Sequence, residues 1–141
     1  MPTVFTRIIS GELPGRFVWE DARCVAFLSA HPLRTGHTLV VPREEIDHWL
    51  DMPAELNAHV METARSTGRA IQRAFQPTKV GMLVAGLEVP HVHVHLVPID
   101  DAHDLDFDRQ QKDPDPKVMD EARDAIRKAL EELGFSQVSR R

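Results

Sequence analysis

The segment "PHVHVHLVP" (residues 90–98) places three histidines two residues apart and follows each with an apolar residue. This alternation is typical of a β-strand, in which successive side chains point to opposite faces of a sheet. We therefore expect a strand over residues 92–97 with the imidazoles on one face, about 7 Å apart at a rise of ~3.3 Å per residue. The apolar residues then face the core. The histidines are His91, His93 and His95, and the apolar residues are Val92, Val94 and Leu96.

Neighbouring histidines can bind a metal ion or carry out catalysis. The unperturbed pKa of histidine is about 6.5, so proton transfer is easy near neutral pH. Because protonated imidazoles repel one another, at least one of the three should stay neutral, and the neutral form is both a nucleophile and a metal ligand. The spacing alone favours both interpretations equally, since zinc accepts three histidines and a water. A solvated strand with incidental histidines is a third interpretation, which the strict spacing disfavours.

A fourth histidine, His37, belongs to the segment "TGHTLVVP" (residues 35–42), where it follows a glycine and begins a β-branched run. We expect a strand here that ends at Pro42. A single histidine at the start of a strand is usually structural. Beside the triple-histidine strand, however, His37 becomes a candidate fourth member of the same site.

The rest of the pattern predicts an α+β domain. Thr3 can cap a short first helix, and Pro116 can open a final amphipathic helix after an acidic, irregular stretch at residues 100–115. Strands that are joined by short turns favour an antiparallel sheet with helices packed on it. The predicted helices cover residues 3–11, 51–75 and 116–133, and the predicted strands cover residues 16–21, 24–28, 37–42, 80–85 and 92–97.

The composition fits a single domain over residues 1–141. The net charge of −5 argues against sequence-independent nucleic-acid binding, but not against a small anionic ligand. Cys24 is the only cysteine, so an intramolecular disulfide is impossible and a reducing compartment is expected. No apolar run reaches the roughly 18 residues that span a bilayer, and Arg7 interrupts the segment where a signal peptide would be apolar. We expect a soluble, cytoplasmic protein with no membrane and no nucleic-acid partner.

The run His91–Val97 resembles the signature of the histidine-triad (HIT) family, His-φ-His-φ-His-φ-φ, in which φ is apolar. The segments "TVFTRIISGELP", "WEDARCVAFL" and "GHTLVVP" look like the N-terminal helix, first hairpin and upstream-histidine strand of the family, so the resemblance covers residues 3–98. The overall look is of the nucleoside phosphoramidase-like bacterial branch. The resemblance implies a HIT-like α+β fold: a five-stranded antiparallel sheet with packed helices, extended across a homodimer. Residues 99–141, an acidic loop and a helix, lie outside the motif-bearing core.

The resemblance also implies hydrolysis or transfer at the α-phosphate of a nucleotidyl substrate, through a covalent nucleotidyl-histidine and with no metal or other cofactor. Carried onto this sequence, His93 is the nucleophile. His91 would orient the site and assist at the leaving group. His95 and His37 would contact the phosphate oxygens. His93 must present one ring nitrogen to phosphorus and anchor the other, for which a backbone carbonyl is the expected partner.

The family's nucleoside pocket maps onto the first helix, the first hairpin and the residues before the triad. The expected substrate-binding residues are Val4, Phe5, Ile8, Phe27, Leu28, Ser29, Glu88 and Val89.

Three departures from the family pattern stand out. Ser29 replaces a carboxylate that commonly holds the ribose hydroxyls. Glu88 occupies a position where a small hydroxyl residue often touches the phosphate, so its carboxylate should point away or pair with a cation such as Arg34. Thr3 and Thr6 stand where some members carry the cysteines of a structural zinc site, so that site is expected to be absent.

Three other functions stay open at this point. A dinucleoside polyphosphate hydrolase or phosphorylase uses the same constellation on a longer substrate. A nucleotide-binding regulatory protein would show little turnover, an alternative that Ser29 and Glu88 motivate. A metal-dependent hydrolase would use the histidines as ligands.

Overall fold

The computed structural model describes residues 1–141 and contains one five-stranded sheet. The strand order is β1-β2-β3-β5-β4, and every neighbouring pair is antiparallel. The predicted five-stranded antiparallel sheet is therefore confirmed. The strands are β1 (Phe17–Glu20), β2 (Cys24–Leu28), β3 (Thr38–Pro42), β4 (Lys79–Leu83) and β5 (Val94–Ile99).

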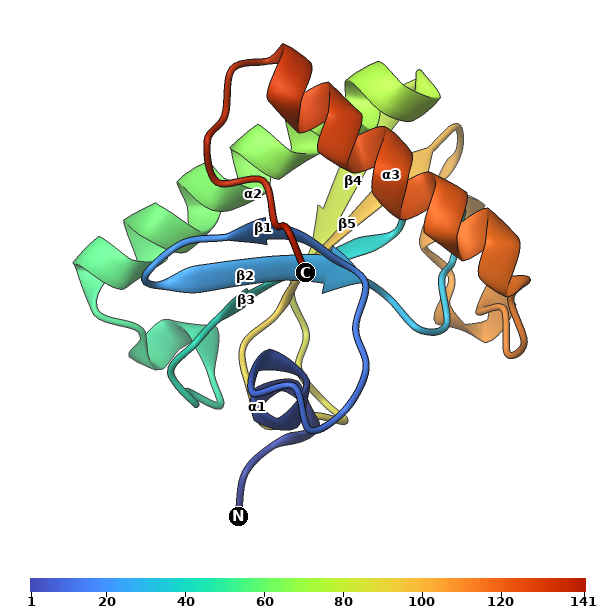
Figure 1. The fold of residues 1–141 in the computed structure, drawn as a ribbon. Helices are drawn as coiled ribbons and strands as arrows, with labels where there is room; N and C mark the ends of the chain where they lie inside the picture. Colours follow the sequence, from blue (N-terminus) through green and yellow to red (C-terminus); the bar gives the residue numbers. More distant parts are fainter.

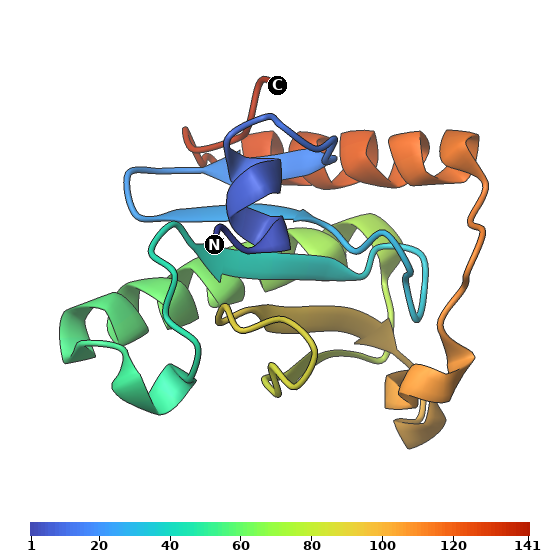
Figure 2. The same ribbon diagram turned by 90° about the horizontal axis from the view of Figure 1, so that it is seen from below.

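The helices cover the two faces of the sheet unequally (Figure 1). The long helices α2 (Ala54–Phe75) and α3 (Pro116–Glu132) pack against each other and against one face. The short helix α1 (Val4–Ile9) lies across the other face, over β1, β2 and β3 (Figure 2). Three 3₁₀ turns complete the chain: η1 (Trp49–Asp51), η2 (Ala102–Leu105) and η3 (Phe107–Arg109). No helix is both long enough and apolar enough to cross a membrane.

Alternation along the strands divides the apolar side chains between these two layers. On β2, Ala26 belongs to the large core beneath α2 and α3, whereas Val25 and Phe27 belong to a smaller cluster beneath α1. A β-bulge in β1 shifts the register between Phe17 and Trp19. The smaller cluster leaves part of its sheet face open, and that open part is where a ligand can approach.

Two predicted boundaries were wrong, each because of one local interaction. The second helix begins at Ala54, and not at Asp51, because Met52 precedes Pro53 and adopts an extended conformation that the following proline ring favours. The histidine strand begins at Val94, and not at residue 92, because the Val92 amide donates to the Ile46 carbonyl in a loop and not to a neighbouring strand.

The two edges of the sheet differ. Residues 137–139 run along the outer edge of β1, where the Glu20 amide donates to the Gln137 carbonyl and the Ser139 amide donates to the Val18 carbonyl. At the opposite edge, β4 pairs only with β5. The edge of β4 is therefore the one place where the sheet can be extended.

The turn into β3 depends on Gly36. Its φ of +102° lies in a region that L-residues avoid, and a Cβ there would come within 2.6 Å of the Phe75 ring on α2. Gly36 therefore lets the backbone pass close to α2 just before His37, and so fixes the direction in which that histidine enters the sheet.

We predict that Gly36→Ala lowers the free energy of unfolding by about 2–4 kcal/mol, from backbone strain and overpacking together. The matched control is Gly134→Ala, because Gly134 also has a positive φ (+89°) but has no atom within 4 Å of its ideal Cβ position. The control should lower the free energy of unfolding only by the backbone strain, about 1–2 kcal/mol. Urea denaturation measures both, and equal losses would show that contact with Phe75 contributes nothing.

Candidate active site

The three histidines of the run occupy two kinds of position. Only His95 lies within β5; His91 and His93 precede the strand. The predicted start of the strand is wrong, but the predicted sharing of one face is confirmed: Phe5 of α1 contacts the His91 and His93 rings, His93 contacts His95, and Val94 and Leu96 belong to the core on the other face. The His93 and His95 ring centroids are 4.9 Å apart.

His91 is fully buried beneath α1, with both ring nitrogens hydrogen-bonded. Its Nε2 lies 2.7 Å from the Pro42 carbonyl oxygen, which can only accept, so the ring proton is on Nε2. Nδ1 then accepts from the Thr3 hydroxyl at 2.7 Å. No ring nitrogen is left for a substrate. Its expected orienting role fits this geometry, whereas assistance at the leaving group stays a prediction that would require one of these two hydrogen bonds to break.

His93 is held through the backbone of His91. Its Nδ1 lies 2.8 Å from the His91 carbonyl oxygen, so Nδ1 carries the proton and donates. In the neutral ring, Nε2 therefore holds a lone pair. Nε2 has no partner in the protein and is not sealed from solvent. The Phe5 ring packs edge-on against His93, with 4.8 Å between the ring centroids.

His37 and His95 form a relay that begins at a backbone amide. The Leu33 N–H donates to His37 Nδ1 at 3.0 Å, so the His37 proton is on Nε2. His37 Nε2 in turn donates to His95 Nδ1 at 2.9 Å, which places the His95 proton on its own Nε2. His95 therefore offers an N–H to the site. His37 is buried and both of its ring nitrogens are hydrogen-bonded within the protein, so the predicted direct contact with phosphate would require it to give up one of these bonds.

All four imidazoles are held in the neutral form. Burial lowers the pKa of His37 to about 3 and that of His95 to about 4, and the neighbouring histidines lower both further. Burial also lowers the pKa of His91 and of His93, although a carbonyl acceptor opposes the shift in each ring. At pH 7 the site thus presents one lone pair, on His93, and one N–H, on His95.

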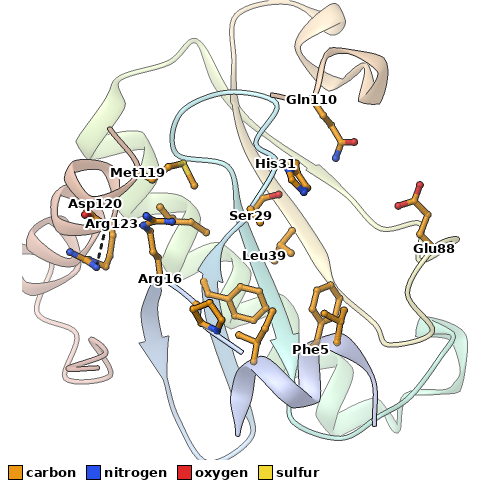
Figure 3. Close-up of a pocket in the computed structure, with 17 residues that line it drawn as sticks. Phe5, Arg16, Ser29, His31, Leu39, Glu88, Gln110, Met119, Asp120 and Arg123 are labelled. Atoms are coloured by element: carbon orange, nitrogen blue, oxygen red, sulfur yellow. Dashed lines mark hydrogen bonds and ion pairs between the residues drawn. The ribbon is translucent and has the colours of Figure 1, made fainter. Parts of the chain in front are cut away.

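A pocket of about 710 Å³ is lined in part by Phe5, whose ring packs on His93, and by Leu39, which pairs with His95; the four histidines themselves are not among its lining residues (Figure 3). Leu39 and Phe27 form its floor and belong to a row across the sheet in which His95 pairs with Leu39, Leu39 with Phe27, and Phe27 with Phe17. Seven of the eight predicted substrate-binding residues line the pocket, and Val89 instead packs against the apolar cluster beneath α1. The seven are Val4, Phe5, Ile8, Phe27, Leu28, Ser29 and Glu88.

Ser29 and Glu88, two of the departures from the family pattern, both line this pocket. Ser29 is buried at the pocket wall, and its amide donates to the His37 carbonyl. Glu88 is exposed at the opposite side of the pocket (Figure 3) and forms no ion pair. The suggested pairing with Arg34 is wrong, because that guanidinium binds Asp100 and Asp104 at 3.2 and 2.7 Å.

Sequence reasoning missed the contribution of the C-terminal third. The Phe107 ring packs edge-on against His95 with 5.0 Å between centroids, and Gln110 and α3 complete the pocket wall. The α3 residues involved are Met119, Asp120 and Arg123. The sequence did place Met119 on the apolar side of the last helix. That periodicity predicts packing against the core, and it gives no sign of a pocket.

Two clusters bear on metal binding. The Thr6 hydroxyl donates to Glu45 at 2.6 Å, and the Thr3 hydroxyl donates to His91, so both positions that carry cysteines elsewhere hold hydrogen-bonded hydroxyls. Separately, ligand atoms of Asp21, Cys24 and His59 lie within 4.8 Å of one another. The Asp21 carboxylate there already accepts four hydrogen bonds, and burial raises the pKa of Cys24 to about 12. This second cluster thus closes the β1–β2 turn.

Comparison with known proteins identifies similar sequences and folds. The family model described as "HIT domain" matches residues 10–102. An uncharacterized HIT-like protein of Methanocaldococcus jannaschii is 33% identical over 99 residues, or 67% of this chain and 77% of that one. Adenylylsulfatase HINT3 of Arabidopsis thaliana is 30% identical over 100 residues, or 67% of this chain and 51% of that one. The solved structure of a hypothetical histidine triad nucleotide-binding protein from Sulfolobus tokodaii superposes with a TM-score of 0.82 at 26% identity, covering 92% of each chain.

The hydrogen bonds predict a specific tautomer for each ring. In long-range ¹H–¹⁵N spectra at pH 7, His93 should be protonated at Nδ1, and His37, His91 and His95 at Nε2. Because burial lowers the pKa of His37 to about 3 and that of His95 to about 4, neither of these two rings should become largely doubly protonated as the pH falls from 7 to 5. An Nε2-protonated His93 at neutral pH would contradict the lone pair that we assign to the site.

Proposed function

The chain belongs to the HIT domain family, and we propose that it is a hydrolase or transferase that cleaves a P–N or P–O bond at the α-phosphate of a nucleotidyl substrate. The observation that carries this proposal is the His93 ring, which the His91 carbonyl holds with its Nε2 lone pair free beside the pocket. The names of two similar proteins support the substrate class, since one is called nucleotide-binding and the other an adenylylsulfatase.

In the first proposed step, His93 Nε2 attacks the α-phosphorus. A bond forms between Nε2 and phosphorus, and the bond to the leaving group breaks, so the leaving group departs with the electron pair and takes a proton from water. His93 becomes an imidazolium, whose Nδ1–H still donates to the His91 carbonyl, and that hydrogen bond stabilises the positive charge.

His95 acts on the phosphate oxygens. Its Nε2–H donates to a phosphate oxygen on which negative charge builds up. The hydrogen bonds from Leu33 to His37 and from His37 to His95 keep this proton on Nε2, so the ring need not change tautomer or orientation during the reaction. Because the His95 ring is partly screened from water by Phe107, the hydrogen bond is stronger than it would be in solution. His37 and His91 are positioning residues in this scheme.

In the second step, water attacks the phosphorus of the nucleotidyl-histidine. The Nε2–phosphorus bond breaks, its electron pair returns to His93, and the water proton goes to solvent. The products are a nucleoside monophosphate and the original neutral ring. The scheme needs no metal or other cofactor, because a neutral imidazole is the nucleophile and the neighbouring ring supplies the electrostatic stabilisation.

The pocket suits the nucleoside part of such a substrate. Its apolar floor and the Phe5 and Ile8 side chains of α1 offer a flat slot for a base, and its volume lies in the range of small-molecule sites. A cytoplasmic location is part of the proposal, in keeping with the lone buried thiol of Cys24.

The proposed intermediate can be trapped directly. After mixing with the 5′-phosphoramidates of adenosine, guanosine or uridine in separate reactions, a rapid acid-free quench and intact-mass measurement should show one nucleotidyl adduct, which peptide mapping places on residues 91–95. His93→Ala should form no adduct and lose at least ~10³-fold in kcat, because it removes the only free lone pair of the site.

The control for the trap is His103→Ala, which removes an exposed histidine from η2 and should keep the adduct and the rate. If the wild-type protein forms no adduct and releases no nucleoside monophosphate from any of the three substrates, the proposed activity is wrong. Binding of nucleotide that is unchanged by His93→Ala would then favour the regulatory alternative.

We further propose that two copies of the chain pair through the free edge of β4. Large apolar side chains are exposed beside that edge, on η1, α2 and β4, and all but Leu50 border an apolar groove of about 360 Å³. Burying them against the same surface of a second copy would extend two five-stranded sheets into one. The most exposed of these residues are Trp49, Leu50, Met61 and Met82.

Light scattering coupled to gel filtration should therefore give a dimer for the wild-type protein and a monomer for Met82→Lys, because a charge on an edge strand opposes pairing. Val118→Lys is the matched control: Val118 is 42% exposed, like Met82 at 49%, but lies on α3 away from this edge. A wild-type monomer, or a dimer that survives Met82→Lys, would contradict the proposed interface.

A further inference from the structure

The end of the pocket farthest from the histidines is charged. Arg16, just before β1, donates from Nε to Asp120 Oδ1 at 2.8 Å, and the Arg123 guanidinium approaches the same oxygen at 3.6 Å (Figure 3). Both terminal nitrogens of Arg16 and the second oxygen of Asp120 have no partner in the protein. The pocket wall thus presents unused N–H donors beside an unused carboxylate acceptor.

The sheet fixes how far this end lies from the chemistry. The row of paired residues that includes the floor runs from His95 on β5 through Leu39 and Phe27 to Phe17 on β1, which is three strand spacings, or about 14 Å. Arg16 directly precedes Phe17, and its side chain extends along the pocket wall toward Asp120 and Arg123 of α3 (Figure 3). A nucleotide with its α-phosphate at His93 and its base on Phe27 and Leu39 would direct the far edge of that base toward Arg16 and Asp120.

We infer that Arg16 and Asp120 read the edge of the base and select guanine, an inference that rests on the proposed function. Guanine presents O6 and N7 as adjacent acceptors, which an arginine binds with two parallel N–H groups. It also presents N1–H and the N2 amino group as adjacent donors, which a carboxylate accepts. No other common base offers both an adjacent acceptor pair and an adjacent donor pair.

Adenine is a poorer match to this end. Its usual protein partners are the side-chain amides of asparagine and glutamine, which donate and accept together. The one such amide that lines the pocket, Gln110, lies on the opposite side from Arg16 (Figure 3). Asp120 is held as an acceptor only, because the hydrogen bond from Arg16 lowers the pKa of its carboxyl group.

The test compares guanosine and adenosine 5′-phosphoramidates by kcat/KM, and GMP and AMP by calorimetry. Wild-type protein should favour the guanine compound at least tenfold in both measurements. Arg16→Met and Asp120→Ala should each reduce that preference below threefold, chiefly by weakening the guanine compound. Both residues are half-exposed and form a surface ion pair, so little loss of stability is expected.

Two matched controls remove the same charges elsewhere. Glu121→Ala changes the next carboxylate of α3, which is exposed and not part of the pocket wall, and Arg65→Met changes an exposed arginine of α2. Both should keep the wild-type preference. The inference is overturned if the wild-type protein uses the two bases equally, or if its preference survives both pocket variants. In either case, turnover of the phosphoramidates would still support the proposed function. Absence of both turnover and nucleotide binding overturns the two together.

Discussion

Three backbone groups set the protonation pattern of the whole site. The Pro42 carbonyl, the His91 carbonyl and the Leu33 amide each have a fixed donor or acceptor character, which a side chain cannot reverse. Each of these groups fixes the tautomer of one ring, and the hydrogen bond from His37 fixes the tautomer of the fourth ring, His95. Neutral imidazole has two tautomers of similar energy, so without these contacts the lone pair and the N–H of the site would exchange places. The fold therefore determines the tautomer of each ring by fixing the positions of these backbone groups.

The same contacts tie the site to the fold. The Thr3 hydroxyl accepts from the Thr6 amide as the cap of α1 and donates to His91, so the start of this helix and the orientation of the ring depend on one oxygen atom. The other partner of His91 is the last residue of β3. Helix α1 is only a turn and a half long and would not be stable alone. Its packing on Phe17 and Phe27, together with this hydrogen bond, holds it above the sheet.

Local patterns in the sequence were sufficient for most of the fold. The cap at Thr3, the β-branched run after His37 and the apolar spacing of α3 each act within a few residues, and the structure contains the elements that they predict. The pattern also predicted that the three rings share one face and that a backbone carbonyl anchors His93, but not where the strand begins or which group holds each of the other rings. His91 and His93 leave the strand because of a bond between Val92 and Ile46, and the charged end of the pocket joins Arg16 to Asp120, 104 residues apart. A resemblance that ends at residue 98 carries no information on that second contact.

The closed edge of β1 also limits the size of any assembly. A sheet with two bare edges can add a copy at each side and grow without end, as fibrils do. Here residues 137–139 occupy one edge, so a second copy that pairs with β4 leaves no bare edge for a third. Because these few hydrogen bonds cover the edge of β1, association through sheet edges would stop at two copies.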